Sequence, residues 1–69
     1  MKRKLPPYTN SQIAFLIDEH IHVERDRHIL KRCLIDGVHF EPLAEEVDMS
    51  VRRVKAIVYR EEQRLLRYL

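Results

Sequence analysis

Apolar residues recur at helical spacing along this chain of 69 residues, and no segment shows the apolar–polar alternation that a half-buried strand would need. The two clearest stripes, each placing its members on one side of a helix, are Ile13, Leu16, Ile17 and Ile21, and then Phe40, Leu43, Ala44 and Val47. The pattern predicts an all-α fold, a bundle of three to four helices.

Local signals set the limits of the first two predicted helices. Residues 9–11 are Thr, Asn and Ser, which are good N-caps, and they precede the first apolar stripe. A second helix is expected from about Val23 to Ile35, and Gly37, the one glycine in the sequence, follows it as the residue that ends a helix in the left-handed conformation. The expected inner face of this second helix is Leu30, Cys33 and Leu34, with Val23 and Ile29 on its flanks.

The length and the residue types limit the classes of protein to which this chain can belong. We expect a flexible basic arm over residues 1–10 and a single helical domain over residues 11–69. A domain of this size buries a small core and has little room for a deep substrate pocket. Because no nucleophile–base pair or glycine-rich phosphate loop is evident, we expect neither an enzyme nor a bound cofactor.

Cysteine, histidine and apolar content point to a reduced, cytoplasmic protein without a metal. Cys33 is the one cysteine, so it cannot form an internal disulfide. The longest apolar run, residues 13–17, is far shorter than the ~20 residues of a membrane span, so no membrane is expected as a partner. His20 and His22 would point to different faces of a helix, so they cannot bind one metal ion together. Glu24 and His28 are spaced to share a metal ion, but a surface ion pair explains that spacing equally well.

Charge is distributed unevenly, although the formal net charge is only +2. Three bases lie in residues 1–10, and residues 51–69 hold six bases against two acids. The middle, residues 11–50, holds nine acids against four bases. Two basic ends around an acidic middle suggest a surface that binds a polyanion, whereas the alternative is a basic last helix that is simply solvated.

Residues 39–60 contain the features of a helix-turn-helix unit. Ala44 is small enough to let a second helix cross closely, Asp48 tolerates the left-handed backbone of a tight turn, and Val54 is an apolar residue placed to fix the crossing. Ser50 is a good N-cap for a last helix that begins near Val51. Such a unit lays its second helix in the DNA major groove. The alternative is a plain helical bundle with solvated arginines.

The predicted outward face of the last helix carries residues that suit base recognition, namely Ser50, Val51, Arg52, Lys55, Ala56 and Tyr59. Arg52 and Lys55 can donate to O6 and N7 of guanine, and Val51 can contact a thymine methyl group. Arg53 and Arg60 lie to the sides of this face, where phosphate contacts fix the register of a protein on the duplex.

The same region resembles region 4 of bacterial sigma factors. The matching residues are Arg25-Asp26-Arg27-His28-Ile29-Leu30, Asp36-Gly37, the run from Glu41-Pro42-Leu43-Ala44 to Asp48-Met49-Ser50, and Val54-Lys55. The spacing holds without gaps from Arg25 to about Leu66, with departures at Asp48, Pro42 and Glu61. The resemblance implies DNA contact from the same outward residues and a phosphate contact near His39. Nothing matches the sigma region that binds core polymerase, so we expect a small regulator of the kind found in prophages and mobile elements.

Two functions are therefore expected to compete. The first is sequence-specific binding of double-stranded DNA by a bacterial or phage transcription regulator. The second is an adaptor that uses the same fold to bind RNA polymerase or a sigma factor, with its acidic middle as the contact surface. The tail, residues 65–69, is expected either to cap the core against the first helix or to form a homodimer contact.

Overall fold

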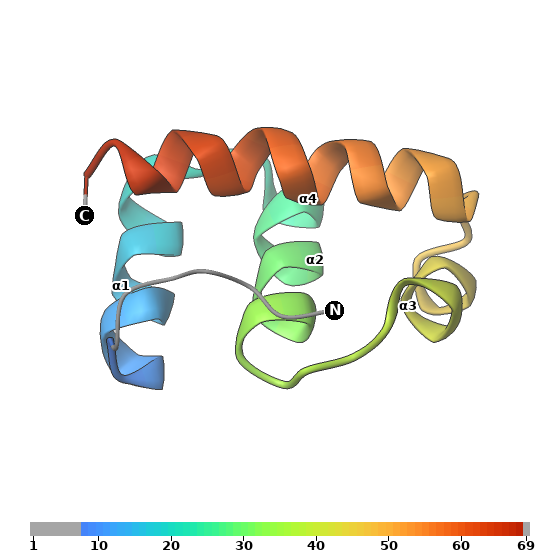
Figure 1. Cartoon of the computed structure of the whole chain (residues 1–69), viewed down its shortest axis with the longest axis horizontal. Helices are drawn as coiled ribbons and strands as arrows, with labels where there is room; N and C mark the ends of the chain where they lie inside the picture. Colours follow the sequence, from blue (N-terminus) through green and yellow to red (C-terminus); the bar gives the residue numbers. More distant parts are fainter. Residues whose placement is uncertain (1–7, 69) are drawn as a thin grey trace.

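The computed structural model describes residues 8–68 and contains four helices, with no strand in that range. The helices are α1 (Asn10–His20), α2 (Glu24–Leu34), α3 (Phe40–Glu46) and α4 (Val51–Leu66). Helices α1 and α2 pack side by side, and α4 runs across both of them from α3 to the end of α1 (Figure 1). The predicted all-α bundle is confirmed.

Helix α1 begins one residue earlier than the predicted domain. Thr9 is the N-cap, and it forms a capping box with Gln12. The Gln12 amide donates to Thr9 Oγ1 at 3.1 Å, and the Thr9 amide donates to Gln12 Oε1 at 2.9 Å. Because this box satisfies two backbone donors, the helix starts at Asn10, inside the arm predicted over residues 1–10. Residues 1–7 of that predicted arm lie outside the described residues.

The turns follow the predicted backbone conformations. Gly37 has φ +72° after α2, and Asp48 has φ +57° between α3 and α4. An aspartate tolerates this left-handed region better than most residues, although less well than glycine. Ser50 caps α4, because its hydroxyl oxygen accepts a hydrogen bond of 3.1 Å from the Arg53 amide.

The core lies where the four helices meet. Its fully or nearly buried apolar residues are Ile17, Ile21, Ile29, Leu30, Leu43, Ala44, Val54, Ile57, Val58 and Leu65. One detail of the prediction was wrong: Ile29 is fully buried, whereas Cys33 and Leu34 are only partly buried. Helix α2 contacts each of the other three helices, so its inward stripe is centred on residues 26, 29 and 30 rather than on its last turn.

The end of α4 packs on the end of α1. Leu65 is buried, and the Tyr68 ring stacks on His20 with 3.6 Å between ring centroids and 6° between planes. These contacts agree with the expectation that the tail caps the core against the first helix. The expected homodimer contact stays a prediction. Leu69 lies outside the described residues. No helix in residues 8–68 has both the length and the apolar character to cross a membrane.

Candidate nucleic-acid interface

Helices α3 and α4 pack as the two arms of the expected unit, joined by residues 47–50. Ala44 is buried at the contact between them, and its carbonyl accepts a hydrogen bond of 2.9 Å from the Met49 amide. Val54 is fully buried on the first turns of α4. The small side chain of Ala44 allows a close approach of the two helices, and Val54 belongs to the same buried core. The start of α4 is thus held at a fixed angle to α3.

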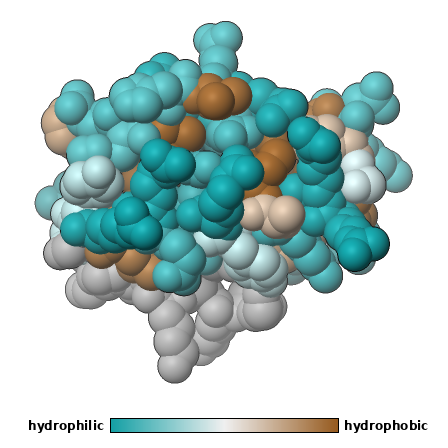
Figure 2. Space-filling model, turned by 90° about the horizontal axis from the view of Figure 1, so that it is seen from above, coloured by the Kyte–Doolittle hydropathy of each residue, from teal (hydrophilic) through white to brown (hydrophobic). Residues whose placement is uncertain are grey.

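Opposite Val54, the first half of α4 faces solvent. Ser50, Arg52, Lys55, Ala56 and Tyr59 are all exposed, as the helical spacing predicted. Val51 differs, because it is half-buried and packs against the core, which leaves only part of its side chain free for a thymine methyl group. The face over which α4 runs is mostly hydrophilic, with scattered apolar spots (Figure 2).

Three cations at the start of this helix are exposed, and none has a carboxylate partner among residues 8–68. They are Arg52, Arg53 and Lys55. Exposed cations without carboxylate partners keep their N–H donors available for an anion or for base edges. His39, the residue with a predicted phosphate contact, is also exposed and is the N-cap of α3 without a side-chain capping bond.

Arg60 lies in a different setting from these three. Its Nε atom lies 2.8 Å from Glu61 Oε2, and its Nη2 atom lies 3.3 Å from Asp26 Oδ2. The guanidinium therefore links α4 to α2. A phosphate contact from Arg60 would compete with two carboxylates. Arg60 therefore differs from Arg53, which has no carboxylate partner in residues 8–68, although both were predicted to contact phosphates.

The acidic partners of Arg60 are buried, and the sequence analysis missed them. The exposed fraction is only 3% for Asp26 and 5% for Glu61, and a third acid beside them in the sequence of α4, Glu62, is 8% exposed. Buried carboxylates need partners, and Arg25 and Arg64 supply further contacts of 3.4 Å to Asp26 and 2.9 Å to Glu61. Helical spacing in the sequence could have revealed their burial, because all three acids lie three or four positions from buried apolar residues of the same helix and so share its inward face.

A second polar cluster joins α2 to α3. The Arg32 Nη2 and Glu46 Oε1 atoms lie 2.9 Å apart, and His28 Nε2 lies 2.7 Å from Glu46 Oε2. Hydrogen bonds from Arg32 and then from His28 lower the pKa of Glu46, and the bonds from Arg32 to Glu46 and Asp36 raise the pKa of the guanidinium. His28 thus pairs with Glu46, eighteen positions away, rather than with Glu24 as the sequence suggested.

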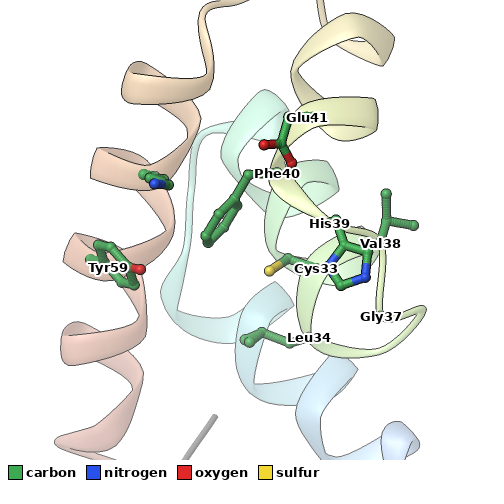
Figure 3. A pocket seen from close by; sticks show the side chains of 9 residues that line it. Cys33, Leu34, Gly37, Val38, His39, Phe40, Glu41 and Tyr59 are labelled. Carbon is green, nitrogen blue, oxygen red and sulfur yellow. The ribbon is translucent and has the colours of Figure 1, made fainter. Parts of the chain in front are cut away.

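A hollow of about 540 Å³ lies beside the outward face of α4, between the end of α2 and the start of α3 (Figure 3). Residues from all three helices and from the α2–α3 loop line it, among them Cys33, His39, Phe40, Lys55 and Tyr59. Within residues 8–68, no three side chains of histidine, cysteine, aspartate or glutamate gather in a way that could hold a metal ion.

Comparison with protein-family models, with curated proteins and with solved structures finds no match to this chain.

Proposed function

We propose that this chain binds double-stranded DNA in a sequence-specific manner and regulates transcription, with the first half of α4 in the major groove. The observation that carries the proposal is the outward face of α4, where Arg52 and Lys55 are exposed and free of carboxylate partners while Val54 anchors the opposite side. A helix held by its buried side and cationic on its outer side has the form that major-groove readers use.

The proposed roles follow the position of each side chain. Arg52 and Lys55 donate to base edges, Tyr59 and Ala56 complete the reading face, and Ser50 contributes through its hydroxyl hydrogen, since its oxygen already accepts from the Arg53 amide. Arg53 and His39 contact phosphates, and Val51 adds a limited apolar contact. We assign Arg60 a mainly structural role, because its guanidinium is bound to Asp26 and Glu61.

The resemblance to sigma region 4 supports a bacterial or phage regulator, and it also keeps the adaptor hypothesis open. An adaptor would present acidic residues such as Glu45 and Glu46 to RNA polymerase or a sigma factor. Glu46, however, is already engaged by Arg32 and His28. This engagement leaves fewer free carboxylates on the acidic surface, whereas the cations of α4 remain available, so the contacts favour DNA.

The test is a selection of bound duplexes from a random library at near-physiological salt. Wild type, Arg52→Ala, Lys55→Ala and their double variant are selected in parallel. Wild type should enrich a short motif, and each single variant should bind that motif roughly 5- to 150-fold more weakly, the effect expected for loss of a good base contact of about 1–3 kcal/mol.

Arg67→Ala is the matched control, because Arg67 is an exposed arginine at the other end of α4. It should leave the motif and the base preferences unchanged. Arg53→Ala should weaken all duplexes alike and flatten the salt dependence of log K by about one unit. If wild type enriches no motif, the proposal fails. If Glu45→Lys then abolishes binding to polymerase or a sigma factor, the adaptor takes its place.

A further inference from the structure

Phe40, at the start of α3, contacts two of the proposed base-reading residues of α4. Its ring meets the Tyr59 ring edge-on, with 6.0 Å between centroids and 80° between planes. The Lys55 ammonium nitrogen lies 5.8 Å from the centre of the same ring. Figure 3 shows Phe40 pointing from α3 toward Tyr59 across the hollow beside α4.

We propose that Phe40 is a positioning residue for base recognition, which sets the directions of the Lys55 and Tyr59 side chains before DNA arrives. The inference rests on the proposed function and adds to it. Phe40 itself need not touch a base, because its effect passes through the two side chains that it contacts.

The physical basis is the freedom of a lysine side chain. Lys55 is exposed and has no carboxylate partner among residues 8–68, so the aromatic ring is the contact that restricts its rotamers. Fixing a side chain in its bound direction in advance removes ordering cost from the binding step. Tyr59 is restricted in the same way, because an edge-to-face pair favours one relative orientation of its rings.

The nature of this contact matters as much as its presence. A carboxylate beside Lys55 would occupy the N–H donors that base recognition requires. An aromatic ring attracts the cation through its face and leaves those donors free to reach guanine O6 and N7. Phe40 therefore orients the lysine without competing for its hydrogen bonds.

Phe40 is also well fixed itself. It is the first residue of α3, and its partly buried side chain packs against the core. The ring consequently has a defined position relative to the buried residues of α4. The ring also lines the open hollow of about 540 Å³ beside α4.

The test compares Phe40→Leu with Phe40→Tyr in the duplex selection. Leucine keeps apolar packing but removes the ring, so the preference at base pairs read by Lys55 and Tyr59 should fall roughly 2- to 10-fold, the size expected for loss of these ring contacts. The preference at the base pair read by Arg52 and the salt dependence should stay unchanged. Tyrosine keeps the ring and should restore the wild-type preference.

Two controls separate positioning from a general effect on the fold. Phe15→Leu makes the same substitution at an exposed phenylalanine on α1, and it should leave all base preferences unchanged. In a Lys55→Ala background, Phe40→Leu should no longer alter the preference at the lysine-read base pair. Each variant is checked by thermal unfolding, and the Lys55 side-chain proton shifts should lose the ring-current displacement in Phe40→Leu alone.

The outcomes distinguish this inference from the proposed function. If wild type enriches no motif, the proposed function fails and Phe40 has no base reading to support. If wild type enriches a motif and folded Phe40→Leu reproduces its base preferences, the proposed function stands and the positioning role is refuted. A loss in Phe40→Leu that Phe40→Tyr does not restore also refutes it.

Discussion

Replacing Arg60 by alanine should destabilise the fold, because its guanidinium holds two carboxylates whose side chains are only 4% and 6% exposed. Leaving a buried acceptor without its partner costs about 1–3 kcal/mol, and breaking a fully buried pair costs about 3–5 kcal/mol. The lower range applies here, since the Arg60 side chain is itself 60% exposed, and Arg25 and Arg64 still contact Asp26 and Glu61. For a domain of this size, about 1–3 kcal/mol corresponds to a fall in Tm of roughly 4–24 °C.

The assay is thermal and urea unfolding followed by circular dichroism at neutral pH. Arg53→Ala is the control, because Arg53 is an exposed arginine of the same helix without an internal carboxylate, and it should change stability by no more than about 0.5 kcal/mol. Adding Asp26→Asn to Arg60→Ala should recover part of the loss, because a neutral amide costs less to bury at position 26 than a carboxylate that has lost one of its two cations. The reasoning is refuted if Arg60→Ala is as mild as Arg53→Ala while its salt dependence of DNA binding flattens by about one unit, since Arg60 would then be a phosphate contact.

Three further predictions concern local features of the fold. Hydrogen bonds from Arg32, and to a smaller extent from His28, hold the pKa of Glu46 below its ordinary value. The Glu46 carboxylate therefore stabilises the fold fully at a pH above its ordinary pKa, and this stabilisation is lost as the pH falls through the lowered pKa. The difference in urea stability between wild type and Glu46→Gln should therefore shrink below roughly pH 4.3, and a constant difference would contradict this. Gly37→Ala should cost about 1–2 kcal/mol in urea unfolding through its φ of +72° alone, since nothing lies within 4 Å of an added Cβ; an unchanged midpoint would contradict it. Ser50→Ala should cost about 1 kcal/mol through loss of the α4 cap, measured as a lower Tm, and Ser50→Asp should retain the wild-type value.

The features that the sequence predicted correctly are those fixed by nearby residues. Gly37 and Asp48 adopt positive φ, and Ser50 caps α4, because each conformation depends on the residue and its immediate neighbours. The exposure of Arg52 and Lys55 follows equally directly. Each residue advances about 100° around a helix, so once Val54 is placed on the inner face the residues on the outer face are known.

Features that depend on contacts between distant residues were not predictable in this way. Arg60 and Asp26 are 34 positions apart, so the pair exists only because α2 and α4 pack together. The partial burial of Val51 likewise reflects how α4 sits on the core. The contact of Phe40 with Lys55 also joins two helices, and spacing within either helix does not reveal it.

The central claim, that the outward first half of α4 binds duplex DNA, is tested most directly by NMR. The amide signals of isotopically labelled protein are followed while the selected duplex is added. The account predicts that the largest shifts lie between Ser50 and Tyr59 and at His39, with small changes along α1. Large shifts confined to α1 and the end of α4, or no shifts at a concentration well above that needed for selection, would contradict it.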